Sequence, residues 1–114
     1  MIMNNLDTLD SFTFSPSKKP EKLIFMLHGY GDNAKNFIEI THFLHQQNKN
    51  INYFALDAPF PIANYPSGKQ WFDIYPNNIN ITEAGPKEMK IVRTQIEISI
   101  KKILNTINYI KNKF

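Results

Sequence analysis

The feature that most constrains the fold is an unbroken apolar run, Leu23–Leu27, that leads directly into the turn His28-Gly29-Tyr30-Gly31. A run of this length with loop residues on both sides is typical of a strand buried on both faces, as in the middle of a parallel sheet. Open α/β sheets bind their ligands in the loops at the carboxyl ends of such strands. The run therefore predicts an interior strand that ends in a ligand-binding turn.

The flanking segments alternate between strand and helix patterns. Residues 10–14 alternate polar and apolar, which suits a half-exposed strand, and residues 53–56 form a second short apolar strand. Asn33 can cap a helix that runs to about Gln47. Residues 59–85 hold four of the seven prolines, which predicts a long irregular stretch.

The clearest element is a helix at the end of the chain. Gly85-Pro86 followed by Glu88 is a helix start, with proline at the first position and an acid in the first turn. Apolar residues then recur every three or four positions over about 25 residues. These are Met89, Val92, Ile96, Ile100, Ile103, Leu104, Ile107 and Ile110. The order strand, helix, strand, loop, helix predicts an α/β fold, and the uniform composition indicates a single domain over residues 1–114.

Composition excludes several classes of function. Cysteine is absent, so disulfides and cysteine metal sites are excluded, which is compatible with a reducing compartment. No apolar run approaches the ~18 residues that span a bilayer, and the first residues do not form a signal peptide. The net charge of +3 comes from lysines interleaved with acids, which predicts a solvated surface without a nucleic-acid partner. We expect a cytoplasmic protein without a membrane span.

The two glycines of the turn allow three interpretations. They let the backbone approach a substrate, so a free N–H could stabilise a tetrahedral oxyanion. The same residues, Gly29-x-Gly31-x-x-Ala34, also satisfy a dinucleotide-binding fingerprint, with Asp57 at the end of the next strand as the ribose-binding acid. The simplest interpretation is a tight turn without chemistry. The turn by itself leaves all three open.

Four motifs in order favour the first interpretation. They are Leu27-His-Gly-Tyr-Gly-Asp32, Leu56-Asp-Ala-Pro59, Asn64-Tyr-Pro-Ser-Gly68 and Trp71-Phe-Asp73. With this order and spacing, the chain resembles the phospholipase/carboxylesterase family, which includes the acyl-protein thioesterases, over about residues 20–110. The resemblance implies the N-terminal portion of an α/β-hydrolase fold, with a partial, mostly parallel sheet and flanking helices. Residues 1–20 would supply an N-terminal strand and connection, and residues 21–114 the family-like region. A dinucleotide-binding module becomes a distant alternative.

The resemblance also implies roles for individual residues. The backbone N–H of Tyr30 would be one oxyanion donor. Trp71 and Phe72 would lie near the substrate channel, and Asp73 would be structural. The turn would be supported by His28, Gly29, Gly31 and Asp32.

The family's nucleophile lies in a Gly-x-Ser-x-Gly elbow, and this motif is absent from the chain. None of the five serines, Ser11, Ser15, Ser17, Ser67 and Ser99, has glycines two residues to either side. The resemblance therefore implies a chain truncated before the nucleophile elbow, without a catalytic serine, acid or histidine. We expect no activity from the chain alone, although the family hydrolyses carboxylic esters or thioesters through an acyl-serine intermediate.

Two hypotheses about function follow. The chain is a relic or one half of a split hydrolase, with a complementary C-terminal half as partner and a small ester or thioester as substrate. Alternatively, it is a non-catalytic binding or interaction domain derived from the hydrolase fold. Neither hypothesis requires a cofactor. Glu39, His42 and His45 share one predicted helix, but we expect a solvated face there and no metal site.

Overall fold

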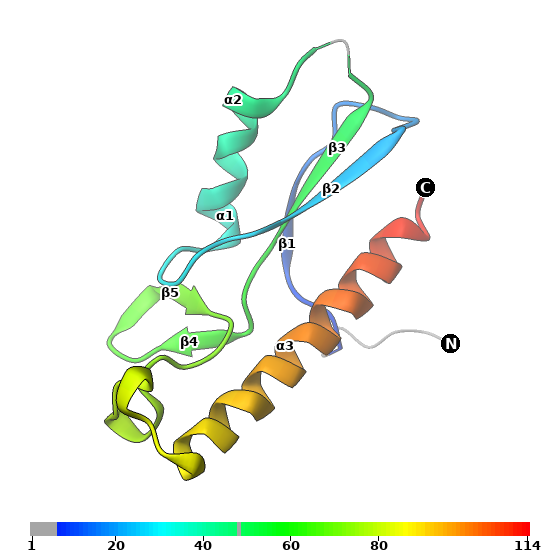
Figure 1. Ribbon diagram of the computed structural model, residues 1–114. Helices are drawn as coiled ribbons and strands as arrows, with labels where there is room; N and C mark the ends of the chain where they lie inside the picture. Colours follow the sequence, from blue (N-terminus) through cyan, green and yellow to red (C-terminus); the bar gives the residue numbers. More distant parts are fainter. Residues whose placement is uncertain (1–6, 48) are drawn as a thin grey trace.

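The computed structural model describes residues 7–47 and 49–114 (Figure 1). Its central sheet contains β1 (Ser11–Phe14), β2 (Lys22–Leu27) and β3 (Ile51–Leu56) in the order β1-β3-β2. β2 runs parallel to β3, whereas β1 is antiparallel to it. The sheet is therefore mixed, and the expectation of a mostly parallel sheet is corrected. Helices lie on both of its faces, which gives three layers.

The buried strand of this sheet is β3. Its residues Phe54 and Leu56 are 4% and 0% exposed, because β3 has a neighbour on each side and a helix over each face. β2 pairs only with β3, and its residues Ile24 and Leu27 are 40% and 48% exposed. The prediction that the 23–27 run is buried on both faces is wrong for the described residues, because β2 lies at the edge of the sheet and pairs only with β3.

The first helical segment begins as the sequence predicts but is shorter and broken. The Asn33 side chain accepts a hydrogen bond from the amide of Asn36 (2.7 Å) and caps α1 (Ala34–Phe37). A 3₁₀ turn, η2 (Ile38–Ile40), separates α1 from α2 (Thr41–Leu44). The Thr41 hydroxyl donates to the carbonyl of Ile38 (2.7 Å), a local bond that competes with regular helix geometry. The helix then ends at His45, whose backbone is extended, and does not reach Gln47.

A β-hairpin occupies part of the stretch that we expected to be irregular. Its strands are β4 (Phe60–Ile62) and β5 (Tyr65–Gln70), and Asn64 adopts a positive φ of 62° between them. Pro61 and Pro66 obscured the hairpin in the sequence, because proline weakens a strand pattern and is tolerated only at edges or bulges. Two short 3₁₀ turns follow, η3 (Pro76–Asn78) and η4 (Ile81–Glu83).

The long helix α3 (Pro86–Lys111) confirms the predicted C-terminal element. The Glu88 carboxylate accepts a hydrogen bond from the Gly85 amide (3.1 Å) and so caps the helix start. Its apolar stripe is buried only in part, because Ile100 and Leu104 remain 51% and 55% exposed. No helix in the described part of the chain is both long and apolar enough to cross a membrane.

The core forms one cluster on each side of the sheet. Towards α1 and α2 it comprises Met26, Ala34, Ile38, Tyr53 and Ala55. Towards α3 it comprises Leu9, Phe54, Leu56 and Ile110, with Leu23, Phe25, Trp71, Ile103 and Ile107 packed around them. Both clusters meet β3, so the residues after β3 are held firmly from two directions.

One buried hydroxyl joins the segment before β1 to α3. The Thr106 Oγ1 accepts a hydrogen bond from the Leu9 amide (2.8 Å) and donates to the Lys102 carbonyl (2.6 Å). Both Leu9 and Thr106 are buried. This pair anchors the N-terminal segment against the helix at the point where the core towards α3 closes.

We expect Thr106→Val to lower the free energy of unfolding by about 1–3 kcal/mol, because it leaves the buried Leu9 amide without an acceptor. The matched control is Thr94→Val, which removes an exposed hydroxyl bonded to the Lys90 carbonyl on the same helix. It should change stability by less than about 0.5 kcal/mol. Urea unfolding followed by Trp71 fluorescence measures both, and equal effects would show that the Leu9–Thr106 bond contributes nothing.

Candidate active site at the turn between β2 and α1

A tight turn follows β2, and glycine is required at its third position. The Asp32 amide donates to the Gly29 carbonyl (3.2 Å), and Gly31 has a φ of +83°. A positive φ at the third residue is the mark of a type II turn, where glycine has no steric penalty. The Gly31 amide donates to the Lys69 carbonyl (3.1 Å). Within the described residues, the amides of Gly29 and Tyr30 have no hydrogen-bond partner.

His28 precedes this turn and is bound to backbone through both ring nitrogens. Its Nε2 accepts a hydrogen bond from the Ala58 amide (3.0 Å), so the proton of the neutral ring is on Nδ1, which donates to the Gly29 carbonyl (2.8 Å). The residue is only 3% exposed. With both nitrogens engaged, His28 has no free atom to take a proton from a nucleophile, and it joins the ends of β2 and β3.

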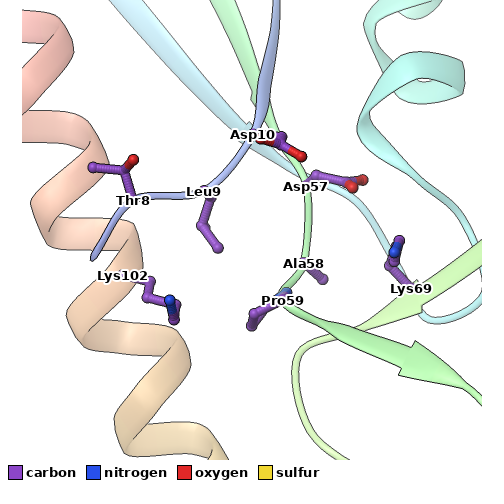
Figure 2. Close-up of a pocket in the computed structure, with 8 residues that line it drawn as sticks. All are labelled: Thr8, Leu9, Asp10, Asp57, Ala58, Pro59, Lys69 and Lys102. Carbon is purple, nitrogen blue, oxygen red and sulfur yellow. The ribbon is translucent and has the colours of Figure 1, made fainter. Parts of the chain in front are cut away.

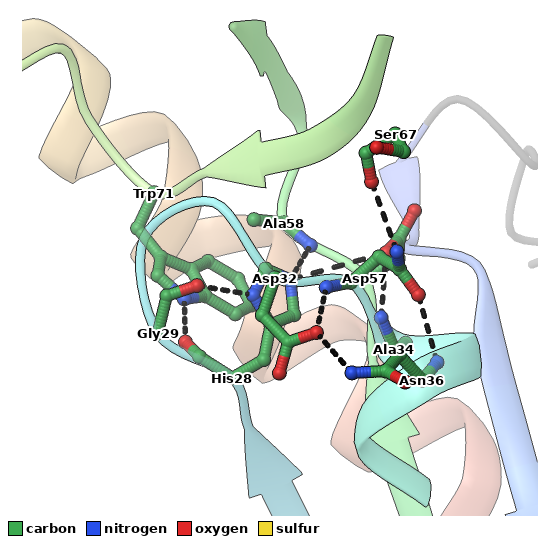
Figure 3. A network of polar contacts seen from close by, with 10 residues as sticks. His28, Gly29, Asp32, Ala34, Asn36, Asp57, Ala58, Ser67 and Trp71 are labelled. Atoms are coloured by element: carbon green, nitrogen blue, oxygen red, sulfur yellow. Dashed lines mark hydrogen bonds and ion pairs between the residues drawn. The ribbon is translucent and has the colours of Figure 1, made fainter. Parts of the chain in front are cut away.

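Carboxylates and amides hold the other side of the turn (Figure 3). The Asp57 Oδ1 accepts a hydrogen bond from the Ala34 amide (2.9 Å), at the first turn of α1. The Asp32 Oδ1 accepts from the Asn33 amide and from the Asn36 side chain, both at 2.8 Å. A dinucleotide would place its pyrophosphate at this helix N-terminus. Because Asp57 already puts a negative charge there, the geometry weighs against the dinucleotide interpretation.

The Trp-Phe-Asp segment connects the turn to α3. The Trp71 indole N–H donates to the His28 carbonyl (2.8 Å), and its ring lies 5.3 Å from the His28 ring. The Trp71 carbonyl accepts from the Ser99 hydroxyl (2.6 Å). The Asp73 amide donates to Gln95 (2.8 Å), and its carboxylate accepts from the Tyr75 amide (2.8 Å). Phe72 beside them is half-buried.

Sequence reasoning missed the contribution of β5 to this site. Besides accepting from Gly31, Lys69 donates its amide to the Asp32 carbonyl (3.0 Å). The Asn33 side chain donates to the Ser67 carbonyl (2.9 Å). These contacts use β5 backbone atoms, which leave little trace in side-chain identity. The available signal was Gly68, whose missing side chain allows close approach.

The serines and the two other histidines do not form a nucleophile–base pair within the described residues. All five serines fall in the described part of the chain, and none is hydrogen-bonded to a histidine there. His42 lies 3.1 Å from Glu39 on the exposed surface. His45 instead packs edge-on against Phe14 and reaches the Tyr53 hydroxyl (3.3 Å), so it is half-buried at the border of the solvated face.

A separate cavity of about 260 Å³ lies beside Ala58 and Pro59, between the end of β3, the segment before β1 and α3 (Figure 2). It is lined by charges of both signs, with Asp10 and Asp57 opposed by Lys69 and Lys102. Tyr30 does not line it. The cavity therefore offers no surface of one charge for a ligand and does not contain the two free amides of the turn.

The sequence model of the family Phospholipase/Carboxylesterase matches residues 9–110. The chain belongs to this family. The match includes β1 and ends within α3, so the turn, the hairpin and the Trp-Phe-Asp segment all lie in the part that this phospholipase/carboxylesterase chain shares with its family. No curated protein matches the chain.

We expect His28→Phe to destabilise this phospholipase/carboxylesterase chain by about 1–3 kcal/mol, because it leaves the buried Ala58 N–H without an acceptor and removes one of the two donors to the Gly29 carbonyl. His42→Ala, at a side chain that is 63% exposed, is the control and should cost less than about 0.5 kcal/mol. Both values come from urea unfolding of the purified chain. A His28 variant as stable as the control would show that the two backbone bonds do not hold the strand ends together.

Proposed function

We propose that the chain is the N-terminal part of a serine hydrolase that cleaves a small carboxylic ester or thioester through an acyl-serine intermediate. In this proposal, the backbone N–H of Tyr30 is one donor of the oxyanion hole. The observation that carries the proposal is this unpartnered amide at the carboxyl end of β2, in a turn that is fixed by its neighbours. Membership of the phospholipase/carboxylesterase family supports the type of reaction.

The physical value of such an amide lies in its fixed direction. A donor held in place before the reaction stabilises the negative charge of the tetrahedral intermediate without any cost of reorganisation. Around Tyr30 the restraint comes from Gly31, which is bonded to Lys69, and from Gly29, whose carbonyl is bonded to both His28 and Asp32. The neighbours are occupied, so a substrate oxygen would meet an available N–H and not a competing internal bond.

The nucleophile would come from a strand beside β2. In the sheet that the family resemblance implies, the strand before the His-Gly turn is flanked by the 53–56 strand and by the strand that leads to the nucleophile. Here β2 pairs with β3 on one side and carries no partner on the other within the described residues. Parallel strands place their carboxyl ends at the same edge of the sheet, so a serine at the end of such a strand would lie level with Tyr30.

Exposed apolar side chains on β2 and α3 support the same arrangement. Ile24 and Leu27 are exposed on β2, and Ile100 and Leu104 on α3. A groove of about 430 Å³ runs along β2, and Ile24 lines it together with Met26, Leu44 and Tyr53, with Lys22 and Lys49 also in its wall. Apolar side chains grouped in this way indicate a surface that another segment covers.

A non-catalytic binding domain is the second candidate. It is favoured by the histidines, since His28 is engaged at both nitrogens, His42 lies on α2 and His45 directly follows that helix. Such a domain would use the hydrolase fold as a scaffold and would have no need for the Tyr30 amide. The two candidates therefore differ in what the free amide does.

Complementation separates the two candidates. We expect the chain alone to give no turnover of a short-chain activated ester and no labelling by a fluorophosphonate, and to aggregate as its concentration rises through the uncharged run 23–27 of β2. Mixed with a C-terminal half from a complete phospholipase/carboxylesterase, it should stay soluble at higher concentration and restore ester hydrolysis. A stable monomer with strongly protected amides at residues 23–27 and no activity in the mixture would favour the binding domain.

Replacement of Tyr30 tests the oxyanion donor directly. Proline suits the second position of a type II turn, so Tyr30→Pro removes the N–H and preserves the turn. In the complemented enzyme it should lower kcat by about 10²–10³-fold, the usual cost of one oxyanion donor. Tyr30→Phe keeps the N–H and is the matched control, with kcat expected within about threefold of the starting protein. Equal kcat values for the two variants would remove Tyr30 from the mechanism.

A further inference from the structure

The β4–β5 hairpin forms a continuous set of backbone contacts with the turn. Lys69 exchanges two hydrogen bonds with it, accepting from the Gly31 amide (3.1 Å) and donating to the Asp32 carbonyl (3.0 Å). The Ser67 carbonyl accepts from the Asn33 side chain (2.9 Å). Beyond the strand, Trp71 donates to the His28 carbonyl (2.8 Å). The segment 67–71 thus follows the turn from one end to the other.

Close packing of one ring against two glycines brings the hairpin this near. A side chain at Gly68 would place its Cβ 2.5 Å from Cε2 of Tyr65 and 3.0 Å from the Gly31 carbonyl oxygen. The same Tyr65 atom would lie 3.9 Å from a Cβ at Gly31. Tyr65 therefore covers both glycines, and Gly68 leaves room for the ring and for the turn at once. Gly68 does not have a positive φ, so only contact excludes a larger residue there.

From these contacts we infer that the β4–β5 hairpin positions the Tyr30 amide, with Gly68 as the positioning residue and Tyr65 as the ring packed against it. This inference rests on the proposed function of that amide. The hairpin accepts a hydrogen bond from the N–H of Gly31 and donates one to the carbonyl of Asp32. The Gly29–Tyr30 peptide, which precedes them, therefore keeps the free N–H of Tyr30 in a defined direction. A displaced hairpin would release Gly31 and let the turn change its orientation. The loss would reduce stabilisation of the transition state more than it reduces the affinity for the substrate.

Amide exchange in the chain and in its complemented form tests the contact itself. Gly68→Ala should lower the protection of the Gly31 and Lys69 amides at least tenfold, while α3 amides stay unchanged. The double variant Tyr65→Ala/Gly68→Ala makes room for the new methyl group and should restore most of that protection. Ser67→Ala, at an exposed side chain whose backbone carbonyl makes the contact, is the control and should have no effect.

Kinetics of the complemented enzyme test the positioning role. Gly68→Ala should lower kcat for an activated ester at least tenfold with KM within about twofold, and the Tyr65→Ala/Gly68→Ala variant should recover it. Asn33→Asp provides a milder second variant, because it keeps the cap on Asn36 and removes only the donor to Ser67. It should lower Lys69 protection and kcat by a few fold even if Gly68→Ala does not fold.

The outcomes separate this inference from the proposed function. An unmodified complemented protein without hydrolysis would overturn the proposed function, while exchange would still decide whether the hairpin holds the turn. Unchanged protection at Gly31 and Lys69 in both the Gly68→Ala and the Asn33→Asp variants would overturn the contact. Altered protection with unchanged kcat, or a loss of kcat that Tyr65→Ala does not recover, would overturn the positioning role.

Discussion

The rest of the site depends on the buried His28 imidazole, which joins the ends of two parallel strands. One nitrogen accepts from Ala58 after β3 and the other donates to Gly29 after β2, so both loops are tied to a single rigid ring. The same residue offers its carbonyl to Trp71, which brings in α3 through Ser99. An unpaired buried polar group costs about 1–3 kcal/mol, so all these partners must stay in place together. These hydrogen bonds together fix the geometry of the turn.

The sequence predicted those parts of the fold that depend on local patterns. The cap at Asn33, the start of α3 at Gly85 and the strands around residues 23–27 and 53–56 were all recognisable from side-chain type and spacing. The hairpin was not, because its pairing runs through residues rich in proline, and its contacts to the turn are made by backbone atoms. The exposure of β2 follows from its place at the edge of the sheet, since the burial of a strand depends on its neighbours as well as on its own apolar residues.

The candidate site was likewise predictable from the sequence only in part. Glycines at 29 and 31 were sufficient to predict a tight turn after β2, and Gly31 does adopt a positive φ. The residues that decide which amide stays free, Lys69 and Ser67, contribute only main-chain atoms and so carry no signature of their own. The interpretation of Asp57 changed for a related reason. A carboxylate at the end of a strand looks equally suited to a ribose or to a helix N-terminus, and only the position of the Ala34 amide distinguishes them.

Polar side chains on α3 hold neighbouring loops in place, although part of the apolar surface of the helix is exposed. Gln95, Ser99 and Thr106 each bond to the backbone of a loop, so the helix fixes the Trp71–Asp73 segment and the chain at Leu9 by directional bonds. Its apolar stripe is covered only in part, since Ile103, Ile107 and Ile110 pack in the core towards α3 whereas Ile100 and Leu104 are exposed. Directional bonds therefore position these loops, while part of the apolar surface of the helix stays exposed. The position of the turn after β2, to which Trp71 is bonded through the His28 carbonyl, therefore depends more on these bonds than on apolar packing at Ile100 and Leu104.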